Sequence, residues 1–281
     1  MKHPIDPKID CVFKAVLGAE ENRNLLVHFL NAVLGNELSA PICSVELLNP
    51  YNEREYLDDK LSIVDVKARD CADRLYQIEV QLLHYLHLPA RMLYTWADIY
   101  SQQLQSGDHY DQLQPTYAIW LLGETILQQD EDYAHAFKFR DTKGRGLVEH
   151  GGIWLLELPK FSAQQIETEQ QRWLKFFKDG ERLDDTALPD WMTTQEMKQA
   201  MSTLRQFSEK ERNYHAYQAR QNFIREQQTI LHELEAERQA KLAAELELQQ
   251  AIDRERAAAE RERAALAEVE RLKALLTQRL D

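Results

Sequence analysis

Polar and hydrophobic residues alternate with a period of two in two short segments, residues 63–69 and 76–81. Both segments are rich in β-branched residues, and this pattern is typical of half-buried β-strands. A polar break at residues 70–73 separates them, so the pattern predicts a β-hairpin from about Lys60 to Leu82. Alternation would place the apolar side chains on one face, namely Val64, Val66, Ala68, Ile78, Val80 and Leu82. The opposite face would carry Asp65, Lys67, Gln77, Glu79 and Gln81.

The patterns around the hairpin predict further helices and strands. Helical spacing of apolar residues predicts helices over residues 8–17 and 22–35, closed by Gly18 and Gly35, and another over 88–105. Short apolar runs predict strands over residues 44–48, 117–122, 134–140 and 153–158. The run 117–122 is apolar almost throughout, which suits a strand that is covered on both faces. Together these elements predict an α/β fold with a mixed central sheet flanked by helices.

The chain contains neither glycine nor proline beyond Pro189 and becomes strongly helical there. We expect a globular domain over residues 1–189, a helical connector over 190–222 and a long charged helix over 223–281. One heptad register runs from Ile224 to Leu280, and 10 of its 17 core positions are apolar or Ala. This pattern favours a weak homotypic coiled coil, although the dense Glu and Arg residues also fit an isolated solvated helix.

Composition limits the possible classes of protein. No segment approaches the roughly 18 apolar residues that a membrane span requires, so no membrane partner is expected. The N-terminus shows no apolar signal-peptide stretch, and the three cysteines Cys11, Cys43 and Cys71 lie far apart with no CxxC pair. These features predict a cytoplasmic protein with reduced thiols.

Charge argues against general affinity for nucleic acid. The formal net charge is −13, and residues 1–217 alone hold 23 Lys/Arg against 34 Asp/Glu. Because phosphate contacts dominate nucleic-acid affinity, such a chain needs a local basic patch, a bound metal or a partner to bind DNA.

The acidic residues of the hairpin suggest where a metal could bind. If the turn centres near Ala72, Asp65 lies directly across from Glu79. Like charges opposed across a β-ladder are destabilising unless a cation lies between them, and hard divalent cations bind carboxylate oxygens. The alternation alone fits equally a polar face that is open to water.

Several segments of the chain resemble one nuclease family. The arrangement of Asp65, Glu79 and Gln81 on adjacent strands, with a lysine nearby, resembles the metal site of the PD-(D/E)XK nuclease superfamily. The amino-acid sequences of residues 59–68 and 76–81 resemble the recombination-promoting nuclease/transposase branch of that superfamily. Further similarity lies in residues 6–14, 29–34, 107–115 and 156–161, and at Arg91, Tyr94, Gln102 and Gln103. The resemblance covers roughly residues 5–225. It implies that the domain over residues 1–189 has a restriction-endonuclease-like core.

The resemblance implies roles for the polar face of the hairpin. Asp65, Glu79 and the backbone carbonyl of Val80 would bind Mg²⁺, for which Mn²⁺ can substitute. Gln81 takes the position of the usual lysine and brings no positive charge, although it can orient a water molecule by hydrogen bonding. Lys67, two residues beyond Asp65, is then the natural substitute for the missing cation.

Other residues are weaker candidates. Asp10 aligns with an acidic position that supports the metal in relatives, or is an ordinary surface carboxylate. Arg91 and Gln102 would contact the DNA phosphate or brace the sheet. Gln77 would orient the substrate or pair with Lys67, and Glu157 with Lys160 matches a family motif that a structural ion pair also explains.

Two functions of different kinds follow from these observations. The first is a Mg²⁺-dependent endonuclease that hydrolyses phosphodiester bonds in duplex DNA, linked to recombination, mobile elements or phage defence. The second is a catalytically weak or inactive nuclease-fold protein that acts as an assembly module through its helical tail. A nuclease acting on RNA or single strands is not separated from the first by the sequence.

Overall fold

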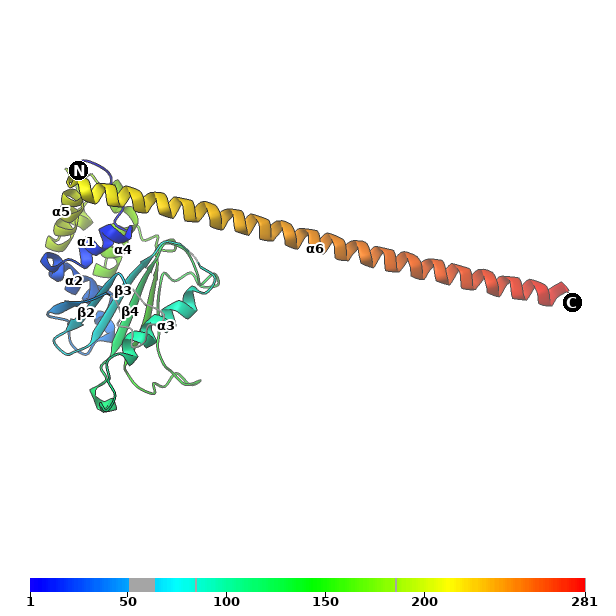
Figure 1. Ribbon diagram of the computed structural model, residues 1–281, viewed down its shortest axis with the longest axis horizontal. Coiled ribbons are helices and arrows are strands. Elements are labelled where there is room, and N and C mark those ends of the chain that lie inside the picture. Colours follow the sequence, from blue (N-terminus) through cyan, green and yellow to red (C-terminus); the bar gives the residue numbers. More distant parts are fainter. Residues whose placement is uncertain (51–63, 84, 185, 281) are drawn as a thin grey trace. The chain divides into compact units, whose positions relative to one another are not determined.

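The computed structural model describes residues 1–50, 64–83, 85–184 and 186–280, with side chains described up to residue 273 (Figure 1). The chain forms two compact units, Met1–Phe223 and Ile224–Asp281. The part of the predicted hairpin before Val64 lies outside the described residues. No helix in the described part of the chain is long and apolar enough to cross a membrane.

The first unit is built on a mixed six-stranded sheet with the order β1-β2-β3-β4-β6-β5. The antiparallel part comprises β1 (Val45–Leu48), β2 (Val66–Asp70) and β3 (Leu75–Gln81). The parallel part continues from β3 to β4 (Thr116–Leu122) and β6 (Gly151–Glu157), and β5 (Ala134–Phe137) closes the edge antiparallel to β6. This sheet confirms the predicted mixed α/β architecture and is consistent with a restriction-endonuclease-like fold.

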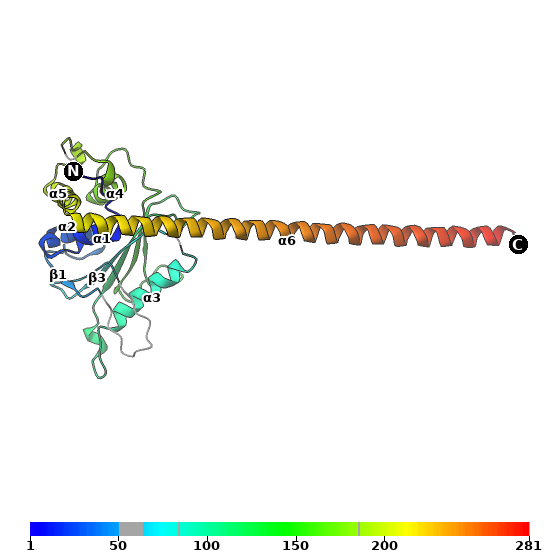
Figure 2. The ribbon, with the colours of Figure 1, turned by 45° about the horizontal axis from the view of Figure 1, so that its top comes forward.

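Helices cover both faces of the sheet (Figure 2). One face is covered by α3 (Leu88–Ser101), and the opposite side is occupied by α1 (Asp10–Leu17), α2 (Arg23–Leu34), α4 (Glu169–Asp179) and α5 (Gln195–Glu209). Short 3-10 helices span Glu20–Asn22, Gly35–Glu37, Tyr110–Gln112, Gly180–Arg182 and Asp190–Met192. The last helix, α6 (Glu211–Leu280), runs through the end of the first unit and forms the second. The long C-terminal helix is therefore confirmed.

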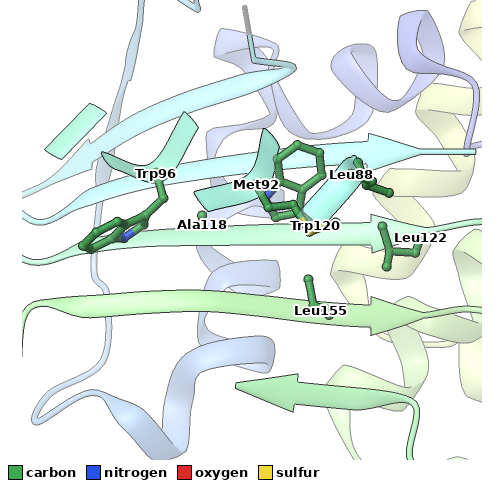
Figure 3. Packing of buried hydrophobic residues seen from close by; sticks show 7 residues of the cluster. All are labelled: Leu88, Met92, Trp96, Ala118, Trp120, Leu122 and Leu155. Carbon is green, nitrogen blue, oxygen red and sulfur yellow. The ribbon is translucent and has the colours of Figure 1, made fainter. Parts of the chain in front are cut away.

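The core beneath α3 shows which side chains of the sheet point toward that helix. Leu88, Met92 and Trp96 of α3 pack on Ala118, Trp120 and Leu122 of β4 and on Leu155 of β6 (Figure 3). In register with the three β4 residues lie Gln77, Glu79 and Gln81 of β3. Neighbours in parallel register point to the same face. The polar residues of β3 therefore lie on the face that α3 covers.

The hairpin turn is held by one buried aspartate. The Asp70 carboxylate accepts hydrogen bonds from the backbone N–H groups of Ala72 and Arg74, at 2.9 and 3.0 Å, and from Arg74 Nε at 2.7 Å. It also accepts one from the buried Tyr76 hydroxyl at 2.8 Å. Asp73 adopts a left-handed conformation with φ of 59°, which Asp tolerates better than most residues. Val66 thus pairs with Ile78, which is the predicted register centred on Ala72.

Some predicted elements differ from the structure. The helix expected over 88–105 ends at Ser101, and α4 was not predicted although Thr168 and Gln171 form a capping box at its start. Gly35 continues in a right-handed helical conformation, whereas a closing glycine usually turns left-handed. Val64 packs with Leu75 and Ile99 on the α3 side, so the alternation predicted for the hairpin breaks at the bend around Asp65.

Candidate metal site at the hairpin

Two carboxylates meet where β2 begins and β3 ends. Asp65 lies in the bend before β2, and its Oδ2 accepts a hydrogen bond of 3.0 Å from the backbone N–H of Val80. Glu79 lies on β3 and is only 4% exposed. Burial raises the pKa of the Glu79 carboxyl well above its ordinary value, and the negative charge of the nearby Asp65 raises it further. The two carboxylates are therefore close enough to repel each other in a poorly solvated position.

The donor atoms at this position suit a hard divalent cation. Glu79 Oε1 is buried and has no hydrogen-bond partner in the described part of the chain. A buried oxygen without a partner is costly unless something binds it. The available donors are carboxylate and backbone oxygens, the ligand type that Mg²⁺ prefers while keeping several waters. No group of three or more His, Cys, Asp or Glu that could hold a metal exists among the described residues, so the protein would supply few ligands.

The polar face of the hairpin is buried at two of its positions. Gln77 is fully buried, and neither polar atom of its side chain has a partner in the described structure. Glu79 is almost as buried. A solvated polar face is thus excluded at these two positions, because α3 covers them.

Lys14 of α1 contacts one of the two carboxylates, Asp65, and the sequence patterns did not single this lysine out. Lys14 Nζ lies 3.0 Å from Asp65 Oδ1. Burial lowers the pKa of Lys14, but the charge and hydrogen bond of Asp65, together with the charges of Asp10 and Glu79, raise it overall. Gly18 lets α1 approach the hairpin closely, since a Cβ there would lie 3.1 Å from Val66 Cγ2. This contact between helix and strand brings residues 51 positions apart into one ion pair.

On the α3 side, Gln81 and Arg91 form the border of the candidate site. Arg91 Nη1 donates to Gln81 Oε1 at 3.1 Å, and the guanidinium carbon lies 5.5 Å from the Trp120 ring centroid. Gln81 Nε2 donates to the backbone carbonyl of Leu83 at 2.7 Å. Arg91 is exposed, and its charge opposes the rise in the pKa of Glu79. Gln81 therefore fixes an arginine beside the carboxylates.

Lys67 lies farther along β2 than the carboxylate pair. It pairs in register with Gln77, whereas Asp65 contacts Lys14. Its side chain is half-buried. The cation in direct contact with Asp65 is accordingly one that comes from another element of the fold.

The remaining candidates are dispersed. Asp10 Oδ1 accepts from its neighbour Cys11 N–H and forms an ion pair of 3.0 Å with Arg220 Nε. Gln102 caps the far end of α3, about 16 Å along the helix axis from Arg91, and donates to Asp98 at 2.9 Å. Glu157 accepts from the backbone N–H groups of Ile126 and Leu127 and pairs with Lys160, which fixes the loop after β4.

Comparison with known proteins gives one match. The family model described as PD-(D/E)XK nuclease family transposase matches residues 7–234, which is well over half of the chain. No curated protein and no solved structure matches the chain. The matched range includes every residue of the site described above.

Proposed function

This chain belongs to the PD-(D/E)XK nuclease family transposases, and on that basis we propose that it is a Mg²⁺-dependent endodeoxyribonuclease that hydrolyses phosphodiester bonds in duplex DNA. Family membership supports a nuclease-type function. The observation that carries the finer proposal is the buried, unpartnered Glu79 oxygen beside Asp65. Such an arrangement destabilises the free protein, and a bound cation would relieve the repulsion.

The residues around the pair have distinct roles in this proposal. Asp65, Glu79 and the Val80 carbonyl would hold Mg²⁺, or Mn²⁺ in its place. The bound ion would polarise the phosphodiester and lower the pKa of a coordinated water. Gln81 Oε1 retains a lone pair beyond the one that Arg91 uses, with which it can orient the attacking water.

Arg91 and Lys67 supply local positive charge in an acidic protein. Arg91 is exposed and held in place by Gln81 and Trp120, so it can contact a phosphate at little cost in side-chain entropy. We also keep Lys67 as a candidate for contact with the substrate. Gln77 could reach the substrate only if α3 moved, and Gln102 only if the DNA extended to the far end of α3. Asp10 would act indirectly, since it is paired with Arg220.

The biological setting is proposed from the family. Its transposase association favours a role in recombination, mobile elements or phage defence. We place the protein in the cytoplasm because its three cysteines lie far apart in the sequence and form no CxxC pair. The alternative, a weakly active protein that serves assembly, is favoured by Gln81 in place of lysine and by the net charge of −13.

Metal dependence is the first test of the proposed activity. Supercoiled plasmid incubated with the full-length protein should become nicked or linear in Mg²⁺ or Mn²⁺ and stay intact in EDTA, as followed on agarose gels. Single-stranded DNA and RNA of the same sequence identify the preferred substrate in parallel reactions. Cleavage that persists in EDTA contradicts the proposal, and intact plasmid in every metal favours the assembly role.

We further propose that the second unit links copies of the chain. Within its described part, the heptad core residues Leu234, Leu248, Leu266 and Val269 are about half exposed or more. Exposed apolar side chains at coiled-coil spacing gain most by pairing with another helix.

If copies of the chain associate through the second unit, disrupting that unit should lower the mass of the particle. Removing residues 224–281, or replacing Leu266 by Asp, should shift the particle to the monomer, which has a mass of 32.9 kDa for the full chain. Light scattering after size exclusion measures this mass. Ala264→Asp introduces the same charge on the outer face of the heptad and should leave the oligomer intact. A full-length protein that is already monomeric would show that α6 is a solvated single helix.

A further inference from the structure

The ion pair between α1 and the hairpin suggests a role for a residue outside the strands. Lys14 Nζ contacts Asp65 Oδ1 at 3.0 Å, while the other oxygen of Asp65 is occupied by the Val80 N–H. The charges of Asp10 and, more weakly, of Glu79 also act on Lys14. Lys14 therefore pairs with one carboxylate of the site and lies within reach of the charge of the other.

Lys14 is also placed to reach a substrate. Its side chain is 42% exposed, in contrast to 11% for Asp65, so the ammonium lies between the buried acids and solvent. A lysine ammonium on a flexible stem can turn from one anion to another nearby. It approaches the pair from α1, while Arg91 approaches from α3 on the other face of the sheet. A phosphate bound at the carboxylates would thus have a cation on each side.

A second ion pair keeps Lys14 available for Asp65. Asp10 lies four residues before Lys14 on the same helix, the spacing at which an acid and a lysine usually pair. Arg220 Nε, from the part of α6 within the first unit, binds Asp10 Oδ1 at 3.0 Å. Arg220 therefore pairs with the acid that competes with Asp65 for Lys14, and it weakens this competition.

We propose that Lys14 supplies the positive charge of the active site that is absent at Gln81, with Arg220 as a positioning residue that acts through Asp10. This inference rests on the proposed nuclease function. In the free protein Lys14 pairs with Asp65, while the Glu79 oxygen stays without a partner in the described structure. With a cation held by the two carboxylates, Lys14 would be free to turn to the scissile phosphate and would stabilise the charge that develops on its oxygens.

Substitutions of Lys14 and of a control lysine on α4 test this proposal. Lys14→Gln in the full-length protein should lower kcat for plasmid cleavage by about 100-fold with a change in KM of less than about threefold, the size expected for losing one preorganised charge. Lys14→Arg keeps the charge and should recover activity to within about tenfold of wild type. Lys175→Gln removes a lysine that pairs with Asp179 within α4, outside the site, and should stay within about threefold of wild type. A fully active Lys14→Gln variant, or a Lys175→Gln variant impaired as strongly as Lys14→Gln, would overturn the assignment.

A thermal measurement tests the ion pair without any cleavage. In EDTA, Lys14→Gln should lower the Tm of the wild type, but it should have almost no effect in an Asp65→Asn background, where the pair is already broken. Equal effects of Lys14→Gln in both backgrounds would show that Lys14 and Asp65 are not coupled and would overturn the inference. A wild-type protein that cleaves no nucleic acid would overturn the proposed function together with it, whereas an active wild type with a fully active Lys14→Gln variant overturns this inference alone.

Discussion

Replacing Asp65 by Asn is expected to lower the rate of plasmid cleavage by at least about 100-fold, because it removes one of the two carboxylates that would hold the cation. Glu79→Gln should have a similar effect on the rate. Both substitutions preserve shape, so the hydrogen bond from Val80 N–H to residue 65 can persist. Rates measured on supercoiled plasmid in Mg²⁺ give the comparison.

Thermal stability shows whether a substitution lowers activity by removing a metal ligand or by unfolding the protein. Because the pKa of Glu79 is raised in the folded protein, its ionised form destabilises the fold, and this loss grows as the pH rises above the pKa of the unfolded chain. Glu79→Gln should therefore raise the Tm at neutral pH while it lowers activity. Asp73→Asn is the matched control, since Asp73 is an exposed turn residue of the same hairpin whose left-handed conformation Asn accepts. A lower Tm in Glu79→Gln, or an equal loss of activity in Asp73→Asn, would contradict this account.

Replacing Asp70 by Ala should cost about 3–5 kcal/mol of the free energy of unfolding, because it leaves the largely covered Arg74 guanidinium and the buried Tyr76 hydroxyl without their shared acceptor. The Asp70 side chain is fully buried, and it accepts from Arg74 and from the Tyr76 hydroxyl. Urea denaturation measures the loss. The same turn sets the register that places Asp65 near Glu79, so cleavage should fall as well.

The chain contains a matched control for this turn. Asp141 accepts from the Lys143 and Arg145 N–H groups and from Arg145 Nε in the same arrangement, with Gly144 in the left-handed position. Its side chain is 38% exposed, so water replaces the lost bonds. Asp141→Ala should shift the Tm only slightly. Equal destabilisation by the two substitutions would mean that burial of Asp70 is not what makes its hydrogen bonds important.

The centre of the fold could be predicted because its signals are local. The period-2 alternation and the short break at residues 70–73 set the hairpin register, and that register places Asp65 near Glu79. The nearly apolar run in β4 correctly indicated a strand covered on both faces. The overlooked helix α4 also had a local signal, the Thr168 and Gln171 capping box.

The cation at the site could not be found in the same way. Alternation along β2 placed Lys67 beside Asp65, but the bend at Asp65 breaks the alternation and Lys14 makes the contact. That contact depends on how closely α1 packs on β2. The close approach is possible because residue 18 is a glycine, and a Cβ there would crowd Val66. Likewise, only packing of α3 shows that Gln77 is fully buried. Periodicity predicts on which face of the sheet a side chain lies. It does not predict which helix packs against that face.

A Mn²⁺ ion located by anomalous diffraction in crystals of the full-length protein would test the metal site most directly. We predict an anomalous peak within coordination distance of the Asp65 and Glu79 carboxylates, and its absence from crystals of Glu79→Gln grown under the same conditions. Wild-type crystals without a peak at these carboxylates, or with Mn²⁺ bound only elsewhere on the chain, would contradict the proposed site.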